Sequence, residues 1–162
     1  MKTTIYHHLE LTKSEVKSHI KKTIQSGGLV VFPTETVYGI GTNAKDSLAV
    51  NRIYQAKGRP SDNPLIVHIA HQEDVKLYIK ELPSIALPLM EAFWPGPLTL
   101  IFKKNEVMPL NVTGGLDTIA IRMPSHPIAL EIIKMSETPI CAPSANVSGK
   151  PSSTLFEHVK YD

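Results

Sequence analysis

The sequence predicts a single α/β domain, residues 1–162, built on a mixed β-sheet with flanking helices. Three observations support this class. Short apolar segments alternate with amphipathic helical segments along the chain. Some connections between the apolar segments are short, which favours a mixed sheet over an all-parallel one. The chain length suits one domain of ordinary composition, with 42% hydrophobic and 20% charged residues.

The first helices and the first strand are predicted from local signals. Thr12–Glu15 matches a capping box, and apolar residues recur at helical spacing from there until residues 27–28, both glycine, end the helix. Residues 29–32 form an apolar run that predicts a buried strand. Asp46 predicts the N-cap of a second helix that ends at Gly58. Three apolar residues are expected on the inner face of this helix: Leu48, Ile53 and Ala56.

The rest of the chain alternates in the same way. The predicted elements are strand 65–69, helix 75–79, helix 85–93, strand 98–102, strand 118–122, helix 127–135 and strand 139–142. The helix over 85–93 ends at Trp94-Pro-Gly-Pro97, because proline cannot continue a helix. No internal repeat, linker or low-complexity segment divides the chain.

The composition excludes several classes of protein. A single cysteine, Cys141, excludes an internal disulfide, and the seven histidines form no HExxH or His-x3-His pair, so no metal held by protein ligands is expected. The apolar runs are too short to cross a bilayer, and the N-terminus lacks the apolar core of a signal peptide. We therefore expect a cytoplasmic protein without membrane contact. The net charge of +2 weakly indicates anionic partners.

Polar residues gather in three clusters. The first is Thr34-Glu-Thr-Val-Tyr38, which follows a predicted strand. Its hydroxyl groups suit the wall of a ligand site, and a turn whose hydroxyls bind their own backbone explains them equally well. Gly39-Ile-Gly-Thr-Asn-Ala44 matches the dinucleotide pattern GxGxxA. It lies too far past its strand to form the required strand-to-helix turn, so a dinucleotide site is not expected.

The second cluster is cationic. Lys57 and Arg59 lie where the second predicted helix ends, and cations there complement the helix dipole, which accounts for one of them without a ligand. Pro60 and Pro64 hold the next residues extended and would direct Arg59 and Asn63 toward a common point. A guanidinium beside an ammonium suits a phosphate or carboxylate, so the pair is a candidate anion site.

The third cluster is Ser144, Asn146 and Ser148, spaced by two so that alternate side chains could face one way. They supply uncharged donors and acceptors, and a polar turn explains them equally well. Arg122, at the end of an apolar strand, needs a partner such as a ligand carboxylate or phosphate. No GxSxG elbow or Ser-His-Asp set is evident. The clusters therefore indicate positioning and charge neutralisation, as in nucleotidyl transfer.

Five motifs in register resemble the YrdC-like family, the threonylcarbamoyl-AMP synthases. They are Pro33-Thr-Glu-Thr-Val-Tyr-Gly39, Lys57-Gly-Arg-Pro60 with Asn63-Pro-Leu-Ile-Val-His68, Phe93-Trp-Pro-Gly-Pro-Leu-Thr99, Ile121-Arg-Met-Pro124 and Ala142-Pro-Ser-Ala-Asn-Val-Ser-Gly149, within residues 28–153. The resemblance implies a twisted sheet with a concave, positively charged face. It also implies a nucleotidyltransferase that joins L-threonine, bicarbonate and ATP into threonylcarbamoyl-AMP with release of pyrophosphate, for N6-threonylcarbamoyladenosine modification of tRNA.

The resemblance implies roles for individual residues. Those expected to contact threonine are Thr36, His68, Arg122, with its carboxylate, and the Ala142 backbone. Those expected to hold ATP are Arg59, Asn63, Thr118, Ser144 and Ser152, with Lys57 and Arg59 as the catalytic cations near the phosphates. The secondary candidates are Thr34, Tyr38 and Asn146. Mg²⁺ would accompany ATP, and a downstream threonylcarbamoyl transferase would take the product.

The chain departs from the family pattern at its end. Family members continue past the last motif with a Gly-rich turn, a Ser-Thr pair and an arginine, so we expect the C-terminal part of the family domain to be missing after Asp162 and a sheet edge to be exposed. Three alternatives remain open. They are a non-catalytic module that binds tRNA or double-stranded RNA, a carbamoyl-adenylate-forming domain as in hydrogenase-maturation carbamoyltransferases, and a structural remnant that dimerises. The aromatic content of 6% argues mildly against recognition of single-stranded RNA.

Overall fold

A six-stranded mixed sheet forms the centre of the computed structural model, which describes residues 3–161. The strands are β1 (Val30–Phe32), β2 (Gly39–Asn43), β3 (Ile66–His68), β4 (Thr99–Lys103), β5 (Thr118–Arg122) and β6 (Ile140–Cys141). Their order across the sheet is β1-β2-β6-β3-β5-β4. β3 and β5 run parallel, and the other neighbours are antiparallel. The predicted α/β class with a mixed sheet is confirmed.

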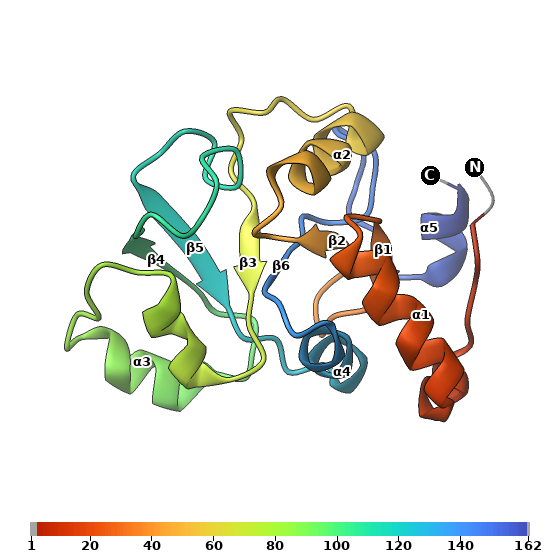
Figure 1. Cartoon of the computed structure of the whole chain (residues 1–162), viewed down its shortest axis with the longest axis horizontal. Helices are drawn as coiled ribbons and strands as arrows, with labels where there is room; N and C mark the ends of the chain where they lie inside the picture. The colour runs from red at the N-terminus through yellow and green to blue at the C-terminus, as the bar shows by residue number, and fades with distance from the viewer. Residues whose placement is uncertain (1–2, 162) are drawn as a thin grey trace.

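Helices cover the sheet. Within the described residues they are the α-helices α1 (Ser14–Gln25), α2 (Ser47–Lys57), α3 (Ala86–Phe93), α4 (Pro127–Ser136) and α5 (Phe156–Tyr161), and the 3-10 helices η1 (His8–Thr12) and η2 (Gln72–Leu77). Figure 1 shows α3 near the β4 end of the sheet and α1 near the β1 end. None of the helices in this part of the chain has the length and apolar character needed to cross a membrane.

Two hydrophobic clusters lie on opposite faces of the sheet. Ile140 and Cys141 are neighbours on β6, so their side chains point to opposite faces, and each belongs to a different cluster. The Ile140 cluster packs α1 and α4 against the sheet, through Val16, Ile20, Ile24, Ala129, Ile132 and Ile133. The Cys141 cluster packs α2 and α3 through Val50, Ile53, Ala86 and Met90, among others.

The start of α1 differs from the prediction. The capping box expected at Thr12–Glu15 is wrong, because the Thr12 hydroxyl donates to the Leu9 carbonyl oxygen at 2.9 Å within η1. α1 follows Lys13, whose side chain makes no cap hydrogen bond. The capping box lies one turn earlier, where the Glu10 carboxylate accepts from the His7 backbone N–H at 2.9 Å.

The first hairpin also differs. β1 was expected to be a buried strand, but it is an edge strand, and Val31 is 43% exposed. β2 was not predicted as a strand. It pairs with β1 and with β6, so Gly39 and Gly41 lie in a strand and form no dinucleotide turn. A Cβ atom on Gly41 would lie 2.5 Å from Cγ2 of Ile140, so the missing side chain lets β6 approach closely.

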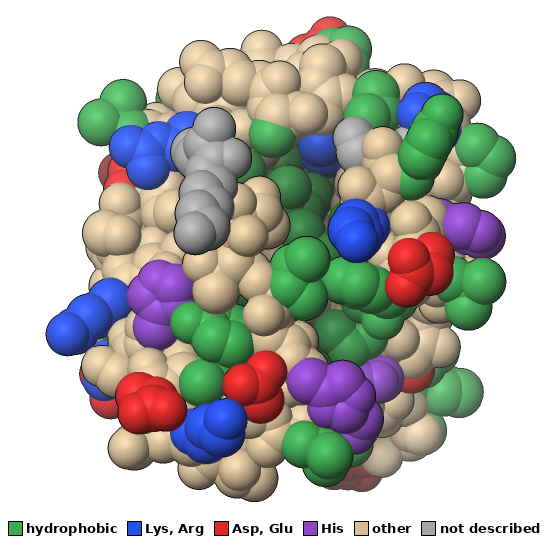
Figure 2. Space-filling model, turned by 90° about the vertical axis from the view of Figure 1, so that its right-hand side faces the viewer, with side chains coloured by type: hydrophobic (Ala, Val, Ile, Leu, Met, Phe, Trp, Pro, Cys, Tyr) green, Lys and Arg blue, Asp and Glu red, His purple; other side chains and the backbone are tan. Residues whose placement is uncertain are grey.

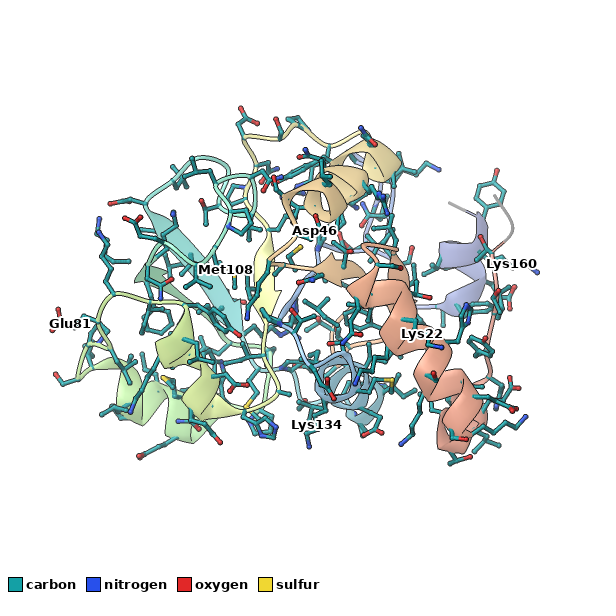
Figure 3. The ribbon with its side chains drawn as sticks, viewed as in Figure 1. Lys22, Asp46, Glu81, Met108, Lys134 and Lys160 are labelled. Atoms are coloured by element: carbon teal, nitrogen blue, oxygen red, sulfur yellow. The ribbon has the colours of Figure 1, made fainter. Side chains whose placement is uncertain are left out.

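The predicted ends of α2 are confirmed. Asp46 Oδ1 accepts hydrogen bonds from the backbone N–H groups of Leu48 (2.9 Å) and Ala49 (3.2 Å), and Gly58 adopts the left-handed conformation at the C-terminus. Figure 3 labels Asp46 at the start of this helix. The predicted inner face is wrong for Leu48 and Ala56, which are exposed, and right for Ile53. The buried stripe follows the helical repeat of Ala49, Val50, Ile53, Tyr54 and Lys57.

The structure differs from the predicted secondary structure at two further places. Residues 75–79, predicted as a helix, lie largely in the 3-10 helix η2. α5 had no predicted counterpart. The remaining predicted strands and helices occur within a few residues of their expected bounds.

Candidate functional site

A pocket of about 300 Å³ opens on one face of the sheet. Ile66 and His68 of β3 are in register with Ala120 and Arg122 of β5, so these side chains share a face. His68 also pairs with Ile140, which places the pocket on the α1–α4 face. The residues that line it come from three loops and from strands β2, β3 and β5: Thr34, Thr36, Val37, Gly39, Arg59, Pro64, Leu65, Ile66, His68, Arg122, Ala142, Pro143 and Ser144.

Arg122 is the most constrained cation of the pocket. It is 8% exposed at the end of β5. Its Nε donates to the Gly96 carbonyl oxygen at 3.3 Å, and its Nη2 donates to Thr36 Oγ1 at 3.2 Å. Nη2 also lies 2.7 Å from Oε1 of Glu35. The anionic partner that the sequence required for Arg122 is therefore present within the chain.

Glu35 contacts Arg122 but does not line the pocket. Both carboxylate oxygens are buried, and neither accepts a well-aligned hydrogen bond from the described residues. Burial acts to raise the pKa of Glu35, but the Arg122 guanidinium and nearby backbone N–H groups together outweigh it, so the pKa of this carboxyl lies below its ordinary value. Glu35 is thus a carboxylate whose charge is balanced by Arg122.

His68 is neutral in this setting. It is 3% exposed, and its Nδ1 lies 3.2 Å from the Ile66 carbonyl oxygen. Burial, reinforced by the positive charge of Arg122, lowers the pKa of His68 to about 4. The imidazole therefore offers a neutral donor or acceptor to the pocket at physiological pH.

The 33–38 loop is held by a hydroxyl group. Thr34 Oγ1 donates to the Val37 carbonyl oxygen at 2.6 Å and accepts from the backbone N–H groups of Thr36 and Val37 at 3.2 Å. This is the turn that binds its own backbone, which the sequence left open. Thr34 and Thr36 also line the pocket, so the turn forms its wall as well.

Arg59 is held by its own loop. Its Nη2 donates to Asn63 Oδ1 at 2.6 Å and to the Pro64 carbonyl oxygen at 3.1 Å. Arg59 lines the pocket, whereas Asn63 is exposed and outside the lining. The two side chains contact each other at the pocket rim, as the prolines of this segment predicted.

Lys57 contacts a different loop. It is 3% exposed, and its Nζ donates to the backbone carbonyl oxygens of Ser144 and Asn146. The Ser148 N–H returns a hydrogen bond to the Lys57 carbonyl oxygen at 3.0 Å. Lys57 is absent from the lining, so it fixes the loop that carries Ser144 against the end of α2.

The other predicted residues lie around the pocket. Ala142 and Ser144 are in the lining, and Thr118 lies at the far end of β5 on the same face as Arg122. Ser152 is exposed and outside the lining. Tyr38 is partly buried and contributes no lining, although its backbone N–H donates to Ser153 at 2.9 Å.

Asn146 is buried. Its Nδ2 donates to the carbonyl oxygens of Val147 and Lys150, and its Oδ1 accepts nothing from the described residues. The predicted alternation of Ser144, Asn146 and Ser148 along one face is wrong, because this segment turns back on itself and is not extended.

Sequence reasoning missed several contributors. No role for Glu35 is predicted from the sequence, although a buried arginine such as Arg122 requires an anionic partner. The Gly96 carbonyl oxygen could not be found from sequence, because backbone acceptors carry no side-chain signal. The apolar lining residues Val37, Leu65 and Ile66 looked like ordinary strand and loop residues.

Two arginines allow the site to bind an anion. Arg59 and Arg122 face the pocket, and no group of three or more His, Cys, Asp or Glu side chains placed for a metal occurs among the described residues. Burial raises the pKa of Cys141 to about 12, so its thiol stays protonated. Figure 2 shows the side of the molecule that lies on the right in Figure 1, where basic and acidic side chains lie close together.

Comparisons with known proteins identify the family of the chain. The Sua5/YciO/YrdC family model, described as telomere recombination, matches residues 22–162. The threonylcarbamoyl-AMP synthase of Pyrococcus abyssi is 60% identical over 139 residues, which are 86% of this chain and 41% of that protein. The enzyme of the same name from Bacillus subtilis is 56% identical over 140 residues, 86% of this chain and 40% of that protein.

A solved structure gives the same result. The crystal structure of P. abyssi Sua5 complexed with L-threonine superposes with a TM-score of 0.87 at 57% identity, and the alignment covers 90% of this chain and 44% of that one. The chain thus spans about two fifths of the length of these relatives. The predicted YrdC-like family is confirmed: the chain belongs to the Sua5/YciO/YrdC family.

Proposed function

We propose that this chain binds L-threonine and ATP and joins them with bicarbonate into threonylcarbamoyl-AMP, with release of pyrophosphate. The observation that carries the proposal is the convergence of Thr36, His68, Arg122, Arg59 and Ser144 on one pocket. The two relatives named threonylcarbamoyl-AMP synthase and the L-threonine complex of P. abyssi Sua5 support it.

Threonine would occupy the inner end of the pocket, which we define as the end lined by the buried residues Arg122 and His68. Its carboxylate would meet Arg122, and its hydroxyl would meet the neutral imidazole of His68 or the Thr36 hydroxyl. The Ala142 N–H already donates to the Ile66 carbonyl oxygen at 2.9 Å, so a backbone contact from Ala142 would use its carbonyl oxygen.

ATP would occupy the outer end, which is lined by Arg59 and Ser144. A volume of about 300 Å³ is at the small end for ligand pockets, so a nucleotide would extend past Arg59 and Ser144 onto the rim. Asn63, Ser152 and Thr118 are the rim candidates. Lys57 would act on the nucleotide by holding the Ser144 loop, since its ammonium group binds backbone oxygens of that loop. Mg²⁺ would enter bound to the phosphates, as part of the substrate.

The chemistry needs positioning more than a protein nucleophile. The threonine amine forms a bond to carbon of CO₂ derived from bicarbonate and gives a carbamate. A carbamate oxygen then forms a bond to the α-phosphorus of ATP, while the bond from that phosphorus to pyrophosphate breaks. Coulomb repulsion opposes the meeting of two anions, and the charge of Arg59, together with a directed N–H contact from Arg122, would offset it.

The product would then pass to a threonylcarbamoyl transferase that modifies tRNA, in the cytoplasm. Direct binding of tRNA or double-stranded RNA by this chain is not part of the proposal, because no observation on the described residues favours it.

The test is pyrophosphate release from MgATP, with threonine and bicarbonate each omitted in turn. The proposal expects release only when both are present. Calorimetric titration of threonine into the same sample, shown to be folded by circular dichroism, provides the control. A folded sample that neither releases pyrophosphate nor binds threonine would contradict the proposed function.

A further inference from the structure

The contacts of the Arg122 guanidinium within the chain involve two of its three nitrogens. Nε and Nη2 are engaged by Gly96, Thr36 and Glu35. Nη1 donates to no other residue among those that the structure describes. The five N–H groups of arginine lie in one plane, so three contacts on one side fix the direction in which the remaining nitrogen points.

Glu35 is placed to hold the guanidinium without reaching a ligand. Its side chain is 19% exposed, both of its oxygens are buried, and it is absent from the pocket lining. Its backbone belongs to the turn that Thr34 closes with hydrogen bonds to Thr36 and Val37, so the carboxylate is carried by a fixed segment.

We propose that Glu35 is a positioning residue, which holds Arg122 from behind so that Nη1 is presented to the substrate carboxylate. The inference rests on the proposed function for the identity of the ligand. It assigns to Glu35 a part in specificity: because Glu35 balances the charge of Arg122, the inner pocket selects a carboxylate by the direction of Nη1 and not by excess positive charge.

A competing role for Glu35 predicts the opposite behaviour. If the carboxylate blocked Arg122 and had to leave before substrate could bind, its removal would tighten threonine binding. The geometry favours positioning, because the Glu35 contact uses Nη2 and leaves Nη1 for a ligand.

The central experiment compares Glu35→Gln with Glu81→Gln. The first change keeps the size of the side chain and removes its charge. The second makes the same change at an exposed carboxylate near α3, which Figure 3 shows far from β1 and β2. We expect Glu35→Gln to weaken threonine binding by about tenfold, measured by calorimetry, with unchanged ATP affinity, and Glu81→Gln to change neither. Unchanged or tighter threonine binding in Glu35→Gln overturns the proposal.

A second measurement separates positioning from a general loss of structure. In the Arg122→Lys background there is no guanidinium to orient, so adding Glu35→Gln should weaken threonine binding by clearly less than it does in the wild type. An equal further loss would show that Glu35 acts independently of Arg122 and would overturn the proposal. Retaining a cation at position 122 keeps the buried carboxylate compensated in the parent of this pair.

A third measurement does not depend on the substrate. Side-chain ¹⁵N NMR of Arg122, assigned with Arg122→Lys, should show separate Nη signals with hindered rotation in the wild type and averaged signals in Glu35→Gln. If the wild type shows the hindered signals but binds no threonine, the proposed function fails and the positioning role stands. If the signals are the same in both proteins, the positioning role fails.

Discussion

Arg122 and Arg59 line the same pocket but are held in different ways. Arg122 leaves a strand of the sheet, and its partners lie 26, 86 and 87 residues away along the chain. Arg59 leaves a loop, and the partners of its guanidinium, Asn63 and Pro64, are within five residues. The first cation therefore depends on the tertiary structure, whereas the second depends on one local turn.

The difference shows how one pocket can combine two kinds of recognition. A buried guanidinium with fixed contacts suits a small ligand that must be oriented, because little freedom is lost on binding. A rim arginine on a short loop can adjust to a longer ligand that extends toward solvent. Under the proposed function, the inner end would be preorganised for threonine, and the outer end would be adaptable for a nucleotide.

The largest effect is expected when the inner cation is removed. Arg122→Met leaves the Glu35 carboxylate buried without its partner, which should lower the free energy of unfolding by about 3–5 kcal/mol. Urea denaturation measures this change. Threonine binding should be lost while ATP binding is retained in the folded fraction. The double variant Arg122→Met with Glu35→Gln should recover part of the stability, and a double variant as unstable as the single one would contradict the ion-pair explanation.

The next effect is a dependence of stability on pH at the inner end. The pKa of His68 is about 4 in the folded protein and about 6.5 in an unfolded chain. Below pH 6.5 the unfolded chain gains a proton that folded His68 does not accept until about pH 4. The contribution of His68 to stability is therefore complete above pH 6.5 and is lost as the pH falls toward 4, by up to about 3 kcal/mol.

Denaturant titrations at several pH values in this window test that dependence. His68→Gln should show a shallower fall in the free energy of unfolding than the wild type. His158→Gln changes an exposed imidazole on α5 and should keep the wild-type slope. Parallel slopes in all three proteins would remove His68 as the cause.

The smallest effect on stability is expected at the outer cation. Arg59→Met loses contacts within one partly exposed loop, so the free energy of unfolding should change by about 0.5 kcal/mol or less. ATP affinity should nevertheless fall about tenfold, because a charge-assisted contact is lost. Calorimetry with each ligand separates the two effects. If Arg59→Met weakened threonine binding as much as ATP binding, the assignment of separate inner and outer ends would be contradicted.

Much of the fold followed from the sequence where signals were local. The cap at Asp46, the stop at Gly58 and the proline-rich end of α3 each act within a few residues. β2 was missed because its glycines and polar residues make it a poor strand by composition, and its pairing partner β6 lies about a hundred residues later. The Thr12 cap failed because two overlapping cap signals competed and the earlier one prevailed.

The site was predictable in its residue types but not in its internal contacts. Thr36, His68, Arg59 and Arg122 were expected, and all of them line the pocket. Lys57 was expected near phosphates, but its ammonium group lies on backbone oxygens of another loop, a partner that no side-chain pattern reveals. Whether Asn63, Thr118 and Ser152 contact a nucleotide stays a prediction.

The position of β6 affects the stage of synthesis at which this pocket can form. The two-residue strand Ile140–Cys141 is the seam between the β1-β2 hairpin and the β3-β5-β4 half of the sheet. Because a chain is synthesised from its N-terminus, both halves exist before the residues that join them have been added. The walls of the pocket come from both halves and from Ala142, Pro143 and Ser144, just after the seam, so a nascent chain must extend past β6 before every wall of this pocket can be in place.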